Sequence, residues 1–167
     1  EILWVEPGTF EVSRDLIAFR EQLVADFDVV APCTHRQRCG LLAPGNARHW
    51  CHTFAPPPPG LLANSDWVRF GQRAGIDLRS LPYSFLALRR KSATTAAAHE
   101  TAARLLGAPR VYKGFAKLLS CDAGGVMELT LQKRDASVLF KALKQDQAPV
   151  PPIYRWTRKG TLITSAE

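Results

Sequence analysis

Four cysteines are the residues with the clearest capacity for chemistry in this sequence. Cys33, Cys39 and Cys51 fall within nineteen residues and Cys121 lies far downstream, in a C-x5-C-x11-C-x69-C spacing. Four thiolates are the full ligand set of a tetrahedral zinc ion or of a cubane iron–sulfur cluster. The chain has no further cysteine, so the spacing predicts one four-cysteine metal centre with no thiol left over.

Other interpretations of the cysteines stay open at this point. The spacing differs from the paired C-x2-C knuckles of common zinc ribbons and from ferredoxin runs. The four could be ordinary thiols, because free cysteine packs as a small hydrophobe. Two disulfides are a further alternative, although a chain of 167 residues can build a core without them. If the metal is zinc, His35 and His52 compete as ligands.

The charge of the chain points to an anionic partner. The net charge is +7 and the isoelectric point is about 9.6, which favours nucleic acid first and an anionic membrane surface second; a solvated basic surface is the simpler alternative. No apolar stretch reaches the roughly 18 residues of a membrane-spanning helix. The expected phosphate contacts, several of them close to the cysteines, are Arg36, Arg38, Arg48, Arg69, Arg73, Lys113, Lys133 and Arg134. Trp50, Phe54 and Trp67 are candidates for stacking on unpaired bases, with a core role as the alternative for each.

The first third of the chain has the pattern of an α/β sheet that positions a long loop. Residues 2–5 and 27–31 read as strands, and residues 13–25 as an amphipathic helix with Ser13 as its cap. This strand–helix–strand order predicts a βαβ unit and therefore part of a parallel sheet. Residues 32–60 form a long irregular segment with many Pro and Gly, which a metal centre would order.

Further strands and helices are expected downstream. Residues 83–89 read as a third strand, and the Ala-rich residues 93–106 as a helix or a flexible insertion that Gly107 and Pro109 end. Residues 111–121 and 126–133 predict a hairpin that turns at 122–125 and brings Cys121 back to the long loop. A last helix is expected over 135–145. We divide the chain into residues 1–108, with the cysteine-rich loop at 32–60, and a small hairpin and helix extension at 109–167.

Taken together, several short motifs resemble one known family. In chain order they are Val5-Glu6-Pro7-Gly8-Thr9, Ala31-Pro32-Cys33-Thr34-His35, Cys39, Trp50-Cys51-His52, Tyr83-Ser84-Phe85, Lys113-Gly114 with Cys121, and Lys133-Arg134-Asp135. This set resembles the C-terminal half of the methyltransferase-like family associated with the mitochondrial small ribosomal subunit and its bacterial relatives. The resemblance covers nearly the whole chain.

The resemblance implies a fold, a cofactor and a partner. It implies the C-terminal part of a Rossmann-like class I methyltransferase sheet and a [4Fe–4S] cluster on Cys33, Cys39, Cys51 and Cys121, with zinc as the alternative. It implies a role in assembly of the small ribosomal subunit through contact with ribosomal RNA. We expect no membrane partner and the bacterial cytoplasm as the location, with the mitochondrial matrix as the alternative. The oligomeric state stays open.

Departures from the family pattern limit what carries over. No G-x-G-x-x-G run occurs in the sequence, so the turn that holds S-adenosylmethionine in such folds is missing. The abrupt first strand suggests a fragment, and we expect S-adenosylmethionine to bind only with a preceding half. Thr34 stands where relatives often have Pro, and Thr53 interrupts their WCHF motif. No catalytic residue is assigned. An active methyltransferase acting on ribosomal RNA or protein and a zinc-stabilised nucleic-acid-binding module remain the alternative functions, and a redox enzyme is disfavoured because no second cofactor motif appears.

Overall fold

The computed structural model describes residues 1–55, 57, 59–92, 102–134, 153–156 and 162–164. Within them the chain is α/β, with two antiparallel sheets and two α-helices. The first sheet contains β1 (Ile2–Pro7), β2 (Phe27–Ala31), β3 (Thr53–Ala55) and β4 (Leu81–Arg90), and the helices are α1 (Phe10–Leu23) and α2 (Ser65–Ala74). The second sheet contains β5 (Ala102–Val111), β6 (Phe115–Asp122), β7 (Gly125–Gln132), β8 (Ile153–Trp156) and β9 (Leu162–Thr164). Short 3₁₀ turns are η1 (Gly40–Leu42), η2 (Pro44–Asn46) and η3 (Leu61–Ala63).

Strand β4 is the centre of the first sheet. Strands β1 and β2 flank it, and β3 extends the β2 side at the opposite end; all three pair with β4 in antiparallel fashion. The predicted order of strand, helix and strand is confirmed, but the predicted parallel neighbours are wrong. The physical reason is that a strand from far downstream takes the place between β1 and β2 and hydrogen-bonds to both, which local periodicity does not reveal.

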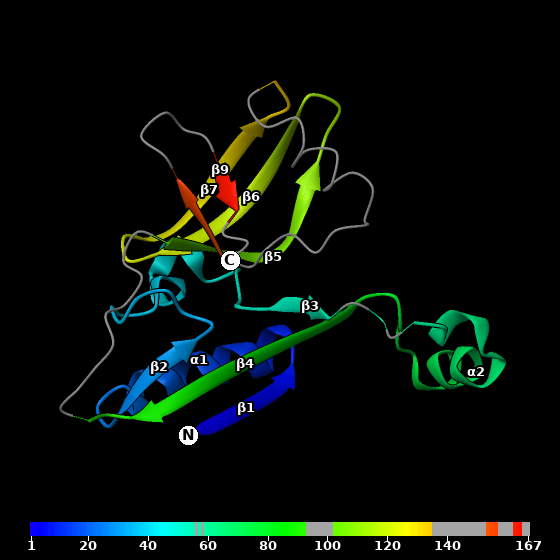
Figure 1. Cartoon of the computed structure of the whole chain (residues 1–167), viewed down its shortest axis with the longest axis horizontal. Coiled ribbons are helices and arrows are strands. Elements are labelled where there is room, and N and C mark those ends of the chain that lie inside the picture. Colours follow the sequence, from blue (N-terminus) through cyan, green and yellow to red (C-terminus); the bar gives the residue numbers. More distant parts are fainter. Residues whose placement is uncertain (56, 58, 93–101, 135–152, 157–161, 165–167) are drawn as a thin grey trace.

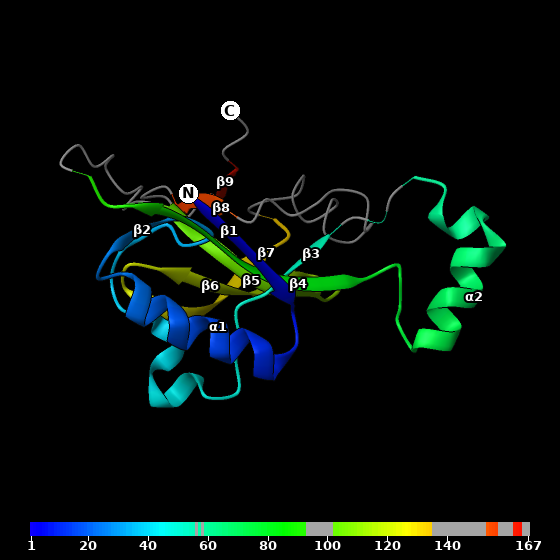
Figure 2. The same cartoon turned by 90° about the horizontal axis from the view of Figure 1, so that it is seen from below.

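Helix α1 covers one face of this sheet (Figure 2). Its buried positions Ser13, Leu16, Ile17 and Arg20 follow the 3.6-residue period, and Leu16 packs on the β4 core. The predicted cap was wrong: the helix begins earlier, with the Thr9 side chain accepting from Val12 N. Ser13 is instead 1% exposed and hydrogen-bonds to Ser84 of β4.

The second sheet has the strand order β7-β6-β5-β8-β9 and lies above the first sheet in the view of Figure 1. The predicted hairpin is confirmed as β6 and β7, paired from Phe115↔Gln132 to Asp122↔Gly125. Residues 102–106, which we expected in a helix or a flexible insertion, belong to strand β5, because they pair with β6 on one side and with β8 on the other. Successive side chains face opposite sides of the strand and both sides are buried: Ala103 and Leu105 pack in one cluster and Leu106 in another. The rest of that expected helix, residues 93–101, and the whole expected helix 135–145 lie outside the described residues.

Two features of β5 concern the expected domain division and the sheet surface. Residue 108, where we placed the boundary, lies inside β5, and the division itself stays a prediction. Gly107 and Pro109 do not end a helix; they lie where the β5–β6 pairing shifts register between Leu106 and Arg110. Gly107 has φ +65°, a left-handed conformation that favours glycine. A bulge of this kind bends the strand and increases its twist locally.

Helix α2 has no counterpart among the predictions. Asn64 caps its start by accepting from Asp66 N, and Gly75 ends it in the left-handed conformation. It lies apart from both sheets in the two views (Figures 1 and 2). Trp67 and Phe70 are about half exposed on it, at 48% and 49%. Neither described helix has the length and apolar character needed to cross a membrane.

Candidate metal centre and neighbouring basic groove

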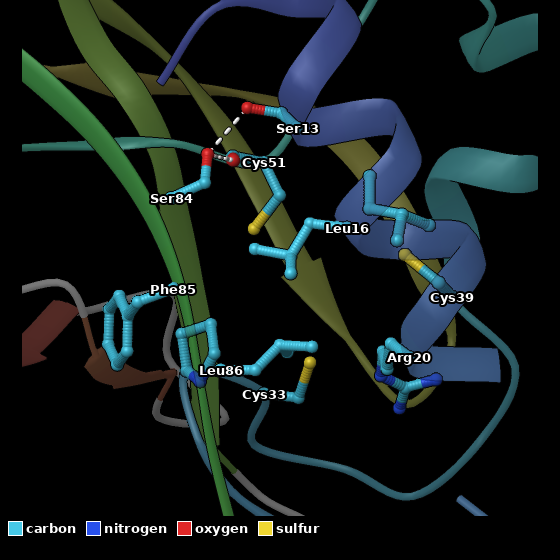
Figure 3. Close-up of a pocket in the computed structure, with 11 residues that line it drawn as sticks. Ser13, Leu16, Arg20, Cys33, Cys39, Cys51, Ser84, Phe85 and Leu86 are labelled. Carbon is cyan, nitrogen blue, oxygen red and sulfur yellow. Dashed lines mark hydrogen bonds between the residues drawn. The ribbon is translucent and has the colours of Figure 1, made fainter. Parts of the chain in front are cut away.

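The four cysteines come together in the interior between α1, β4 and the second sheet. Cys33 follows β2, Cys39 precedes η1, Cys51 precedes β3, and Cys121 lies near the end of β6. Cys33, Cys39 and Cys51 line one pocket with Ser13, Leu16, Arg20 and Ser84. In Figure 3 these three sulfur atoms point toward the same interior space. Cys121 and Cys51 both pack against the buried cluster that contains Cys39.

Hydrogen bonds fix the loop that carries the first three cysteines. The Ser84 hydroxyl donates to the Cys51 carbonyl at 2.6 Å, and Gly107 N donates to the His52 carbonyl at 3.0 Å. The Cys39 backbone N donates to Glu21 Oε1 at 3.2 Å. These contacts tie the loop to β4, to β5 and to α1 respectively, so a segment with little regular structure has a defined path.

Gly40 of this loop packs against the start of β7 with no room for a side chain. A Cβ placed on it would stand 2.8 Å from the Gly125 Cα and 2.9 Å from the Val126 N, both backbone atoms. We therefore expect Gly40→Ala to lower the free energy of unfolding by about 2 kcal/mol, because backbone must move to make room. Thermal unfolding monitored by circular dichroism measures the loss. The matched control is Gly45→Ala in the same loop, where a Cβ meets nothing within 4 Å; equal losses in the two variants would contradict the close packing.

Two buried arginines surround the thiols. Arg20 is 2% exposed and Arg104 is 3% exposed. Arg104 donates from Nη1 to Cys51 Sγ at 3.2 Å, and its guanidinium lies 5.8 Å from the centre of the Phe85 ring. Arg20 hydrogen-bonds to Glu21 and donates from Nη2 to the carbonyls of His35, at 3.4 Å, and Gln37, at 3.0 Å. Arginine is almost never fully buried unless its charge is compensated.

That compensation is incomplete within the described part of the chain. No carboxylate there forms an ion pair with Arg104, whereas Arg20 pairs with Glu21. The Nε atoms of both arginines, Thr34 Oγ1 and His35 Nδ1 are buried and meet no hydrogen-bond partner among the described residues. Four unpartnered polar atoms next to the cysteines mark a site whose polar groups are not satisfied by the protein alone.

The surroundings of three thiols, Cys39, Cys51 and Cys121, favour their neutral form by raising the pKa of each. Burial, together with smaller contributions from the neighbouring Cys33 and Cys51, raises the pKa of Cys39 to about 11. Burial likewise raises the pKa of Cys51 and of Cys121, against the lowering effect of Arg104. The neighbouring cysteines add to the rise in the pKa of each of these three thiols. A metal would bind them as thiolates and release their protons.

The residues present fit a thiolate-bound centre in chemistry and charge. Within the described ranges, no three His, Cys, Asp or Glu side chains are arranged to hold a metal ion, so the sulfurs would have to shift to become ligands. The donor set is nevertheless complete, and a zinc ion with four thiolates carries two negative charges, which two buried guanidiniums would offset. His35 Nε2 lies 3.8 Å from Cys121 Sγ, whereas His52 stacks on Trp50 and faces away from the cysteines toward a separate groove.

The expected phosphate contacts are all exposed but do not form one surface. Arg36, Arg38 and Arg48 lie on the cysteine loop, while Arg69 and Arg73 lie on the separate helix α2. The remaining three gather at one end of the second sheet, where Lys133 N donates to the Gly114 carbonyl: Lys113, Lys133 and Arg134. Two of the loop and helix cations pair with acids, Arg36 with Asp28 and Arg69 with Asp66.

A groove beside the metal site holds residues that the sequence analysis did not single out. It has a volume of about 510 Å³ and lies between the segment Arg48–His52 and the bulged part of β5, with Arg110, Lys117 and Glu128 on its other side. Trp50 and His52 stack at 4.7 Å along it. The sequence did contain one signal for this groove: side chains alternate between the two faces of a strand, so Lys117 lies on the same face of β6 as Cys121.

Comparison with known proteins identifies a family. A family model described as mitochondrial small ribosomal subunit Rsm22 matches residues 1–148. No curated protein and no solved structure matches the chain. The match covers all four cysteines and the whole of the first sheet, and the family is methyltransferase-related and tied to the mitochondrial small ribosomal subunit. The chain belongs to the Rsm22 family.

Proposed function

We propose that this protein is a methyltransferase-like factor of the small ribosomal subunit that carries a four-cysteine metal centre and contacts ribosomal RNA. The observation that carries the proposal is the convergence of Cys33, Cys39, Cys51 and Cys121 on one buried site with two buried arginines. The family match supplies the association with the small ribosomal subunit.

The metal centre has a structural role in this proposal. Its ligands come from the loop after β2 and from β6 of the second sheet, so a bound centre would join the two sheets at one point. A [4Fe–4S] cluster is the proposed group and zinc the alternative. The cluster supplies covalent cross-links between distant segments, and the chain's own residues provide the thiolates and the buried positive charge.

Contact with RNA is proposed for the exposed basic positions on the cysteine loop and at the end of the second sheet. The net charge of +7 favours a polyanionic partner. Arg38 and Arg48 lie near the metal site, and Lys113 lies on the β5–β6 turn. Arg69 and Arg73 would contact RNA separately, from α2.

The family match bears on two further points, methyl transfer and the location of the protein in the cell. No Gly-rich cofactor turn occurs in this sequence, so we assign none of its residues to S-adenosylmethionine binding. For the location, the mitochondrial matrix agrees with the family description, and the bacterial cytoplasm that we first expected does not. We therefore propose the mitochondrial matrix.

The association is tested by following the tagged protein through a sucrose gradient of mitochondrial lysate. We expect it to sediment with the small subunit or its precursors, and we expect depletion of the protein to reduce the amount of mature small subunit. A protein that stays at the top of the gradient at low salt, with small-subunit levels unchanged on depletion, would contradict the proposed function.

A further inference from the structure

The groove between Arg48–His52 and the second sheet has the features of a binding site for a charged chain. We propose that it binds an unpaired stretch of RNA. Arg110 and Lys117 would contact its phosphates, and a base or sugar would lie against the aromatic wall formed by the stacked rings of Trp50 and His52. This inference rests on the proposed function for the availability of RNA, and it names the surface that contacts it. The groove has a volume of about 510 Å³, which is within the range of roughly 300–1,000 Å³ that is usual for ligand pockets.

The basic side of the groove contains an unfavourable pair of like charges. Arg110 and Lys117 are directly opposite each other across β5 and β6, and like charges in cross-strand positions destabilise a sheet. Glu128 of β7 forms ion pairs with both of them. One carboxylate between two cations leaves a net positive charge, and Arg48 adds another from the opposite side of the groove. A phosphate bound here would complete the compensation.

The aromatic side is fixed rather than adaptable. Trp50 donates from Nε1 to the Gly8 carbonyl at 2.9 Å, and its ring stacks on His52 with a 17° interplanar angle. His52 in turn lies against Gly107, where an added Cβ would stand 2.8 Å from the imidazole ring. Rigid rings that remain partly exposed provide a stacking face at little entropic cost, as in proteins that bind single-stranded nucleic acid.

The combination favours RNA over a free small anion. A lone phosphate would use the cations and leave the aromatic wall without a role, whereas a nucleotide chain uses both. The groove also opens toward Arg48, which is exposed, so the backbone can continue beyond it. The site is built from β5, β6, β7 and the cysteine loop, and it is separate from the pocket that holds Cys33 and Cys39.

The test is fluorescence anisotropy with a labelled single-stranded RNA of about twelve nucleotides, measured over a range of salt concentrations. We expect the double variant Arg110→Gln/Lys117→Gln to bind about tenfold more weakly and its salt slope to fall by about 1.4, the value for two lost phosphate contacts. Glu128→Gln should bind about threefold more tightly, because the competing carboxylate is gone. The matched control, Arg79→Gln/Arg89→Gln, removes two exposed cations that also pair with carboxylates, and its affinity should stay within about twofold.

The outcomes separate this inference from the proposed function. Equal losses in the double variant and its control, or no effect in either, would overturn the groove while leaving RNA binding in place. A wild-type protein that binds no single-stranded RNA but still sediments with small subunits would overturn the groove and keep the ribosomal association. Failure of both measurements would contradict the proposed function as well. Near-ultraviolet circular dichroism verifies that the variants are folded.

Discussion

Cys51→Ser is expected to remove the metal centre and to lower the free energy of unfolding by at least about 4 kcal/mol, since loss of a structural metal is among the largest effects of a single substitution. Cys51 lies where the loop meets both β4 and β5, through the Ser84 hydrogen bond to its carbonyl and the Arg104 hydrogen bond to its sulfur. If it were an ordinary buried thiol, the same change would bury one hydroxyl and cost only about 1–3 kcal/mol. Metal analysis together with thermal unfolding distinguishes these results.

The matched control for this variant is Ala116→Ser. Ala116 is fully buried and packs in the core on the opposite face of β6 from Cys121. The control buries a comparable hydroxyl in the same sheet, so it should be destabilised but retain the metal. A Cys51→Ser protein that keeps its full metal content would show that Cys51 is not a ligand.

Arg104→Met is expected to raise or lower the free energy of unfolding depending on whether the site holds a metal. A buried arginine that faces neutral thiols lowers the stability of the fold, because its charge is not compensated. Without a metal, replacing it by an apolar side chain of similar size should therefore leave the free energy of unfolding unchanged or raise it. Next to an anionic thiolate centre, the same change leaves negative charge buried without its partner and should cost about 3–5 kcal/mol. We expect the loss, together with reduced metal content.

Two further variants make the Arg104 result specific. Arg104→Lys keeps the charge and should retain more of the metal than the methionine variant. Arg89→Met removes an exposed arginine that pairs with Glu1, and its stability should change by no more than about 0.5 kcal/mol. Unfolding midpoints in urea and metal analysis of all three proteins supply the comparison. A stabilised Arg104→Met protein would contradict an anionic centre at this site.

Features of the fold that depend on residues close together in the chain could be predicted from the sequence, and features that depend on distant residues could not. The first strand, its helix and the following strand could be placed because their apolar periodicity is local. The position of β4 between β1 and β2 could not, because it is decided by long-range pairing with a strand about 50 residues away along the chain. The Ala-rich composition of residues 93–106 predicted a helix or a flexible insertion, yet pairing with β6 makes residues 102–106 part of a strand, as tertiary context overrides propensity.

The same contrast between local and long-range interactions applies to the candidate site. Cysteine count and spacing, together with the family resemblance, predicted one four-cysteine site. In the structure Cys33, Cys39 and Cys51 line one pocket and Cys121 packs against the cluster that contains Cys39; metal binding there stays a prediction. Nothing in the sequence singled out Arg104, since its burial next to Cys51 requires the cross-strand partner Cys121. The groove was missed for a related reason: Arg110 and Lys117 become neighbours only through the register of β5 and β6. Helix α2 did have readable signals, because Asn64 and Gly75 are a typical cap and stop.

The most direct measurement is an absorbance spectrum of the anaerobically purified protein, with iron, sulfide and zinc determined on the same sample. A [4Fe–4S] centre predicts a broad visible absorption band and about four irons per chain, both lost on exposure to air or in Cys51→Ser. A colourless protein with about one zinc per chain would contradict the cluster and make the site a zinc centre. A protein with neither metal would contradict the four-cysteine centre altogether.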